Sequence, residues 1–179
     1  MGMETFEVKQ GLMKSIGGNA GLAKMATRYF DDVQVDGDGI FTANFAILKH
    51  VECGFNEKGK LVVEVEQMKG LDLGDFLEND GGREKAMESR KRWSSFLDAA
   101  TGYNPKQRGD KAKEAGKKLS KAKSSVAMAR KLMLISEKMS AETKAEAEVF
   151  IAEIEAKLEE GDGTRAASLS VKLNKLLSP

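Results

Sequence analysis

The sequence has 179 residues, of which 41% are hydrophobic and 32% are charged, and its formal net charge is only +1. This length suits one or two globular domains, and no apolar run approaches the ~18 residues that a membrane span needs. The polar N-terminus lacks the apolar core of a signal peptide, so we expect a cytoplasmic protein. A single cysteine, Cys53, excludes an intramolecular disulfide and a cysteine zinc cluster.

Positive charge is concentrated in the segment from Asn104 to Met139. This segment holds eleven Lys or Arg and three Asp or Glu, a net charge of +8, whereas residues 1–103 carry −4 and residues 140–179 carry −3. An almost neutral chain is therefore two acidic blocks around a basic one. Such asymmetry says more about partners than the overall charge does.

A strand and a helix are predicted first. Residues 4–9 alternate polar and apolar side chains, which predicts a short strand. The glycine-rich residues 11–21 predict a loop that leads into a helix near 19–30, with Asn19 as its N-cap.

The pattern then changes to that of strands. Val33 and Val35 predict a short strand, and Asp36-Gly37-Asp38-Gly39 predicts a hairpin turn, because the glycine supplies the positive φ that a tight turn needs. The same stretch resembles a fragment of a calcium loop, but the remaining ligands of such a loop are missing. The returning strand is expected at 40–45.

The apolar-rich run 40–55 is too long for one ordinary strand. We therefore expect a break near 44–48, followed by a strand at 49–55. The side chains expected on one face of that strand are Lys49, Val51, Cys53 and Phe55. A second hairpin turn at 56–59 then leads into a strand at 60–67.

A loop is predicted over 69–82, with a short turn at 73–77, because four glycines interrupt this stretch. A helix follows at 83–100, and Gly102 stands where a glycine commonly ends a helix. The apolar stripe of this helix consists of Ala86, Trp93, Phe96 and Ala100.

This order of elements indicates the α+β class for residues 1–103. A curled antiparallel sheet with two helices on one face satisfies the order strand, helix, four strands, helix. The side chains expected on the other face are Thr42, Asn44, His50, Glu52, Glu64 and Glu66.

Helices are predicted throughout residues 104–179, which we take as a second domain. A heptad seam runs along the first of them and consists of Ala112, Ala115, Leu119, Ala122, Val126, Ala129 and Met133. Ser140 is the expected N-cap of a helix at 141–160, and Thr164 that of a last helix. Together these segments predict a helical hairpin or three-helix bundle, with residues 105–125 projecting as a basic arm.

One stretch carries a family resemblance. The run from Phe96 to Arg108, together with Ala46-Ile47-Leu48-Lys49 and the strand from Lys60 to Glu66, resembles a small archaeal family of unknown function whose members adopt a fold like that of the TATA-box-binding protein. The resemblance covers about residues 4–120 and implies that fold and an archaeal origin. It supplies no activity and no catalytic residues. The TATA-binding protein inserts phenylalanines into DNA from its sheet face, and the polar, acidic face expected here does not suit that mechanism.

The basic segment is the candidate binding site. Its lysines and arginine would neutralise phosphates of RNA or DNA without reading their sequence, since no aromatic side chain is available for base stacking. The residues expected to do so are Lys106, Arg108, Lys111, Lys113, Lys117, Lys118, Lys121 and Lys123. The alternative is that these charges face solvent or pair with the two acidic blocks.

Two other functions stay open. The heptad seam predicts a protein-interaction module in which helices 112–133 and 141–177 bind a partner or a second copy. The sheet face is a candidate for binding a small ligand. No constellation supports an enzyme, a metal site or a cofactor site, because His50 is the only histidine and no nucleophile or metal-ligand motif is present.

Overall fold

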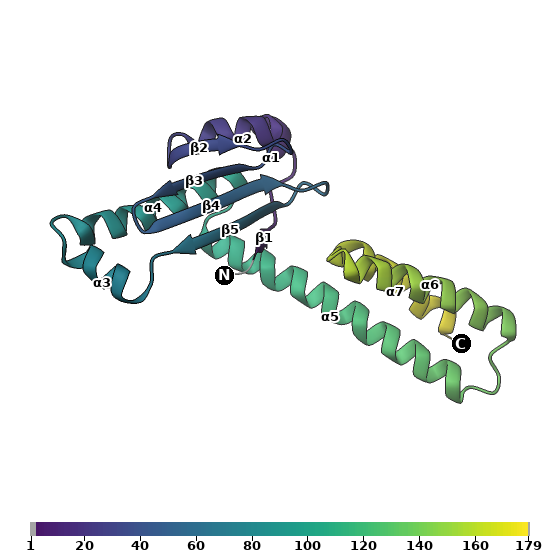
Figure 1. Ribbon diagram of the computed structural model, residues 1–179. Helices are drawn as coiled ribbons and strands as arrows, with labels where there is room; N and C mark the ends of the chain where they lie inside the picture. The colour runs from purple at the N-terminus through teal and green to yellow at the C-terminus, as the bar shows by residue number, and fades with distance from the viewer. Residues whose placement is uncertain (1–2, 179) are drawn as a thin grey trace. The chain divides into compact units, whose positions relative to one another are not determined.

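The computed structural model describes residues 3–178 and divides the chain into two compact units, Met1–Gly109 and Asp110–Pro179 (Figure 1). The first unit contains a five-stranded antiparallel sheet, and the second unit is helical. The predicted α+β class with a helical C-terminal region is therefore confirmed. Within the described residues, no helix combines the length and the apolar character needed to cross a membrane.

The sheet has the strand order β1-β5-β4-β3-β2, and each neighbouring pair is antiparallel. Its strands are β1 (Glu4–Phe6), β2 (Asp31–Val35), β3 (Phe41–Phe45), β4 (Leu48–Phe55) and β5 (Leu61–Gln67). β1 is shorter than the predicted strand 4–9. It pairs with β5, so the first and last strands of the sequence lie side by side at one edge.

Both predicted hairpin turns are present. Asp36 Oδ1 accepts hydrogen bonds from the backbone N–H groups of Asp38 and Ile40, at 2.8 and 3.0 Å. Asn56 Oδ1 makes the equivalent pair of bonds in the second turn. Gly39 and Gly59 have φ angles of 85° and 76°, a region that favours glycine. These turns set the registers of β2 with β3 and of β4 with β5.

The core of the first unit lies on one face of the sheet. The helices α1 (Leu12–Ile16), α2 (Gly18–Ala26) and α4 (Gly82–Thr101) belong to this unit (Figure 1). The buried side chains of α2 and α4 join those of the strands in one cluster. Phe96 lies at its centre, with ring centroids 5.2 Å from Phe30 and 5.7 Å from Phe41. Trp93 packs at the edge of the cluster and is partly buried.

The predicted N-cap role of Asn19 is wrong. α2 begins at Gly18, its N-cap is Gly17, and Asn19 lies inside the first turn with its side chain bonded to the backbone of Phe55. Residues 12–16, expected to be loop, form α1. The helix predicted to reach residue 30 ends at Ala26.

Lys49 was predicted to share the inner face of β4 with Val51 and Cys53, but it is exposed. The registers of β4 with β3 and with β5 both shift near the start of β4, and Ala46 just before it has a φ of 48°. This irregularity places Leu48 rather than Lys49 in the core, where Leu48 is 1% exposed.

The predicted loop at 69–82 contains a helix, α3 (Gly70–Glu78). Leu73, Phe76 and Leu77 are partly buried. Gly82 makes the corner with α4 possible, because a Cβ there would overlap the carbonyl oxygen of Phe76. Of the glycines that suggest a loop, Gly70 begins the helix, Gly74 lies inside it, and Gly81 and Gly82 follow its end.

The second unit contains most of α5 (Pro105–Ile135), with α6 (Ala141–Glu159) and α7 (Gly163–Leu177). One buried cluster unites the three helices, and it consists of Ala122, Val126, Ala129, Ala147, Ile151, Ile154, Ala166 and Leu173. The predicted cap of α6 is confirmed, since Ser140 accepts a hydrogen bond from the N–H of Thr143. The cap of α7 is Asp162, not Thr164 as predicted.

Candidate nucleic-acid interface

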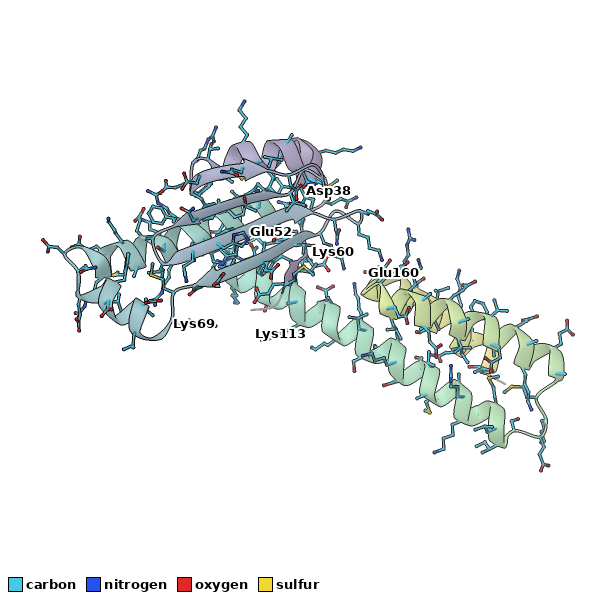
Figure 2. The ribbon with its side chains drawn as sticks, in the orientation of Figure 1. Asp38, Glu52, Lys60, Lys69, Lys113 and Glu160 are labelled. Carbon is cyan, nitrogen blue, oxygen red and sulfur yellow. The ribbon has the colours of Figure 1, made fainter. Side chains whose placement is uncertain are left out.

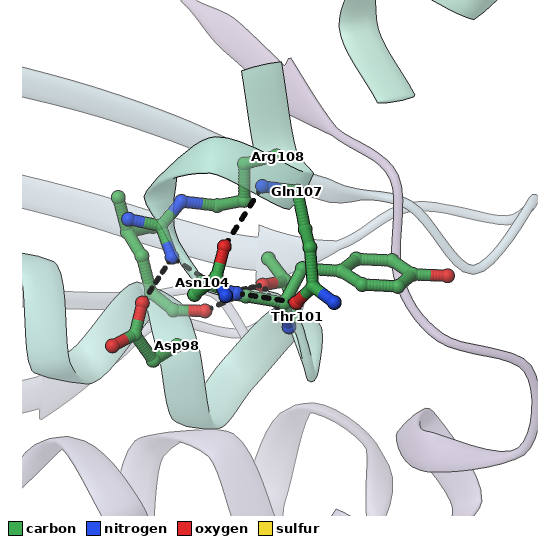
Figure 3. A network of polar contacts seen from close by, with 7 residues as sticks. Asp98, Thr101, Asn104, Gln107 and Arg108 are labelled. Atoms are coloured by element: carbon green, nitrogen blue, oxygen red, sulfur yellow. Dashed lines mark hydrogen bonds and ion pairs between the residues drawn. The ribbon is translucent and has the colours of Figure 1, made fainter. Parts of the chain in front are cut away.

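A polar network connects the end of α4 to the start of α5 within the first unit (Figure 3). Asn104 Oδ1 accepts a hydrogen bond from the backbone N–H of Gln107 at 2.8 Å, and Gln107 Oε1 accepts one from the N–H of Asn104 at 3.0 Å. This reciprocal pair is a capping box, which satisfies two N–H groups at the start of α5. Thr101 Oγ1 donates to the carbonyl of Leu97 at 2.7 Å and accepts from the N–H of Tyr103 at 3.2 Å.

Arg108 belongs to this network. Its side chain is only 8% exposed, and its Nη1 donates to Asp98 Oδ1 and, at 2.7 Å, to the carbonyl oxygen of Tyr103. The guanidinium thus joins the last turn of α4 to the first turn of α5. Of the eight basic residues predicted to contact phosphates, Arg108 is the least exposed, and its guanidinium is bonded to the end of α4 and to the Tyr103 carbonyl.

Lysines recur every fourth residue along the middle of α5, and we call this set the lysine stripe: Lys113, Lys117 and Lys121. Lys113 is labelled in Figure 2. All three are exposed, and among the described residues none of them has an ion pair. Steps of four residues keep them within about 80° of one another on an α-helix. The buried seam residues Ala122 and Val126 lie on the opposite side of the helix.

The other candidates lie elsewhere. Lys111 and Lys118 flank Glu114, with Nζ to carboxylate distances of 3.9 and 3.5 Å. Lys106 is exposed in the first turn of α5, in the first unit, and Lys123 is exposed on the flank of the helix between the stripe and the seam. The eight residues therefore divide into one buried arginine, two paired lysines and five exposed lysines.

The sequence could have identified the stripe from its spacing alone, since positions four apart share a helix face. It could not have identified Asp98 as the partner of Arg108, because the two residues meet only when Gly102, with its φ of 78°, ends α4 and turns the chain. One acidic residue, Asp110, lies one turn before Lys113 on the side of the stripe. The heptad seam, predicted to bind a partner or a second copy, is also used inside the second unit. Its residues Ala122, Val126 and Ala129 are buried in the unit's own core.

The sheet face opposite the core carries the polar side chains that the sequence placed there. Thr42, Glu52 and Glu64 lie side by side on β3, β4 and β5, and His50 lies opposite Glu66. His50 Nε2 is 3.8 Å from Glu52 Oε2. Cys53 is on the core side, and its burial raises the pKa of the thiol far above the ordinary value. Within residues 3–178, no group of three or more His, Cys, Asp or Glu is placed to hold a metal ion.

Comparison of the chain with curated proteins and with solved structures gave no match. Comparison with protein-family models gave one, a domain of unknown function (DUF5611), over residues 3–114. The matched region includes the whole sheet, the capping network and the first lysine of the stripe. Because this match spans more than half of the sequence, the chain belongs to the DUF5611 family.

Proposed function

We propose that this protein is a non-enzymatic, cytoplasmic protein that binds RNA or DNA electrostatically through the lysine stripe of α5. The observation that carries the proposal is the exposure of Lys113, Lys117 and Lys121 on one helix face, without ion pairs among the described residues. Lys123, in the same unit, would add charge at the margin of the stripe. Arg108 is left out of the interface because its guanidinium is already bonded to Asp98 and Tyr103.

The physical basis is counterion release. Successive lysines of the stripe are separated by about 6 Å along the helix axis. A DNA duplex carries one negative charge per about 1.7 Å of its axis, so a straight row of ammonium groups finds several phosphates within reach. Point charges on flexible stems contact phosphates and not base edges, and we therefore expect affinity without sequence preference.

The proposal also includes the archaeal origin and the TATA-binding-protein-like fold that the family resemblance implies. A TATA-binding-protein-like arrangement of the first unit is supported by the strand order and by the helices that pack on one face of the sheet. The archaeal origin rests on the family resemblance alone. The opposite face carries Glu52, Glu64 and Glu66, which would repel a DNA backbone. Binding through the sheet in the manner of the TATA-binding protein is therefore not part of the proposal.

The test is fluorescence anisotropy with a labelled generic RNA and a generic DNA duplex across a salt series. The triple variant Lys113→Gln, Lys117→Gln, Lys121→Gln is compared with the matched control Lys91→Gln, Lys172→Gln, Lys175→Gln, which removes the same charge from exposed lysines elsewhere. We expect the stripe variant to reduce the slope of log K against log salt by about 2 to 3, from a loss of three phosphate contacts. The control should keep the wild-type slope.

Two outcomes would contradict the proposal. If the wild-type chain does not bind RNA or DNA at low salt, the proposed function is wrong. If the two triple variants lose nucleic-acid affinity equally, net charge and not the lysine stripe determines that affinity.

A further inference from the structure

A hollow of about 290 Å³ opens on the sheet face opposite the core. Met3, Ile40 and Val62 supply apolar walls, and the backbone of Gly54 lies between them. Glu52 and Glu64 also line the hollow. It is thus an apolar recess with two carboxylates, on a face that is otherwise polar.

Gly54 is part of the lining of the recess. It lies in a central strand, opposite Val62 of β5, and its lack of a side chain leaves room for Ile40 against the backbone. A Cβ at Gly54 would overlap Cδ1 of Ile40, so the Ile40 side chain rests directly against the glycine and forms one wall. Glycine inside a strand often marks a place where another group approaches the backbone closely.

The two carboxylates give the recess its charge. Glu52 and Glu64 are directly opposite each other on β4 and β5, and like charges in that position destabilise a sheet. In the described part of the chain, the only ion pair of either carboxylate is the 3.8 Å contact of Glu52 with His50. No lysine or arginine of residues 3–178 pairs with them, so their negative charge is available to a cation from solution.

The chemistry selects the kind of cation. No three-ligand cluster suited to a metal ion exists among the described residues. A primary ammonium group instead offers three N–H donors, which two carboxylates facing each other across neighbouring strands accept well. The apolar walls would take a short hydrocarbon chain attached to the nitrogen, as ligand pockets combine apolar linings with a few polar groups that fix orientation.

We propose that this recess binds a small amphipathic primary amine, with the ammonium group between Glu52 and Glu64 and the hydrocarbon chain against Ile40, Gly54 and Val62. This site is independent of the lysine stripe, shares no residue with it and has the opposite charge preference.

The probe is n-hexylamine, added to the full chain and followed by the amide resonances of Gly54 and Val62 in two-dimensional NMR, with hexan-1-ol as the uncharged probe. The double variant Glu52→Gln, Glu64→Gln keeps the shape of the recess and removes its charge. Glu66→Gln is the control, because Glu66 lies on the same strand and the same face as Glu64 but does not line the recess.

We expect saturable shifts at Gly54 and Val62 with hexylamine, and weaker binding of hexan-1-ol. The double variant should bind hexylamine about tenfold more weakly, and Glu66→Gln should bind it within about twofold of the wild-type affinity. The proposal is overturned if hexylamine produces no saturable shift at these amides, or if hexylamine and hexan-1-ol bind equally to the wild type. Equal weakening by Glu66→Gln would also overturn it, since the amine would then sense only the charge of the face.

Discussion

The side-chain amide of Asn19 bonds to both backbone polar groups of Phe55. Its Oδ1 accepts the N–H of Phe55 at 2.7 Å, and its Nδ2 donates to the carbonyl of Phe55 at 3.5 Å. β3 pairs with β4 only as far as Cys53, so the end of β4 lacks a strand partner on that side. An asparagine from α2 therefore completes the hydrogen bonding of the strand and fastens the helix to the sheet.

Asn19→Ala is expected to destabilise the first unit by about 1 to 3 kcal/mol, because it leaves the N–H of the buried Phe55 without its acceptor. The measurement is urea unfolding followed by the fluorescence of Trp93, the only tryptophan, which packs against the core of the first unit. Asn79→Ala, at an exposed position of the same unit, is the control and should change stability by less than about 0.5 kcal/mol. Equal effects of the two substitutions would refute the role assigned to Asn19.

This contact also shows what the sequence could and could not predict. The local signals were sufficient where neighbouring residues decide the structure, as in the turn at Asp36 and Gly39, the end of α4 at Gly102 and the cap at Ser140. Asn19 stands where an N-cap is expected, and only the position of β4, thirty-six residues later, gives its side chain another partner.

The same reason explains the other errors in the fold. A strict alternation of side chains along the strand predicts Lys49 inside, whereas the register shift near Leu48 comes from pairing with two other strands. The sequence pattern does not predict α3, because Gly70 and Gly74 interrupt it, although the partly buried Phe76 and Leu77 give the helix a packed side.

In the candidate interface, the sequence correctly predicted that basic residues gather on one helix but could not rank them. The side chains of Lys113, Lys117 and Lys121 are exposed, whereas that of Arg108 is buried. Arg108 is buried because it bonds to Asp98 and Tyr103, which precede α5. The capping box of Asn104 and Gln107 depends, by contrast, only on residues three positions apart, so it is a local pattern.

Arg108 is expected to act on stability and not on nucleic-acid affinity. Arg108→Ala should destabilise the first unit by about 1.5 to 3 kcal/mol, because it removes hydrogen bonds of a charged donor and leaves the Tyr103 carbonyl without that partner. The measurement is again urea unfolding followed by Trp93 fluorescence. Lys106→Ala, two residues earlier and exposed, should stay within about 0.5 kcal/mol of the wild type. A stability loss as large for Lys106→Ala would show that the first turn of α5 is sensitive to any substitution.

Cys53 is expected to be unreactive in the folded chain. Burial raises the pKa of its thiol, so the thiolate that attacks a disulfide reagent is not formed at mild pH. Treatment with 5,5′-dithiobis(2-nitrobenzoic acid) should release almost no thionitrobenzoate from the native protein and one equivalent per chain in denaturant. Rapid release of one equivalent from the native protein would contradict the burial of this side chain.

The same pKa shift predicts a dependence of stability on pH. The folded state favours the protonated thiol, so this contribution to stability is fully present below the unfolded-state pKa of about 8.5. It is lost progressively as the pH rises from there towards the raised folded-state pKa. Cys53→Ala, compared with the wild type at neutral pH and at pH about 10, should therefore show a smaller decline in stability at the higher pH. An equal decline in the two proteins would mean that other groups cause it.

Two glycines of the second unit should respond to alanine in opposite directions. Gly116 lies in the exposed interior of α5, and a Cβ there would meet nothing within 4 Å, so Gly116→Ala should stabilise the unit by about 0.5 to 1 kcal/mol. Gly163 begins α7 close to α5, and a Cβ there would lie 3.2 Å from the carbonyl oxygen of Ala115 and 3.2 Å from Cβ of Lys118. Because neither neighbour is the mobile end of a side chain, Gly163→Ala should destabilise the unit by about 1 kcal/mol.

The measurement is thermal unfolding followed by helical circular dichroism, with Trp93 fluorescence recorded in parallel to report the first unit separately. Both substitutions should leave the fluorescence transition unchanged, because both lie in the second unit. If the two substitutions shift the midpoint of the helical transition in opposite directions, α7 begins in close contact with α5 at Gly163. If the two substitutions stabilise equally, helix propensity alone decides the result and the close approach of α7 to α5 is refuted.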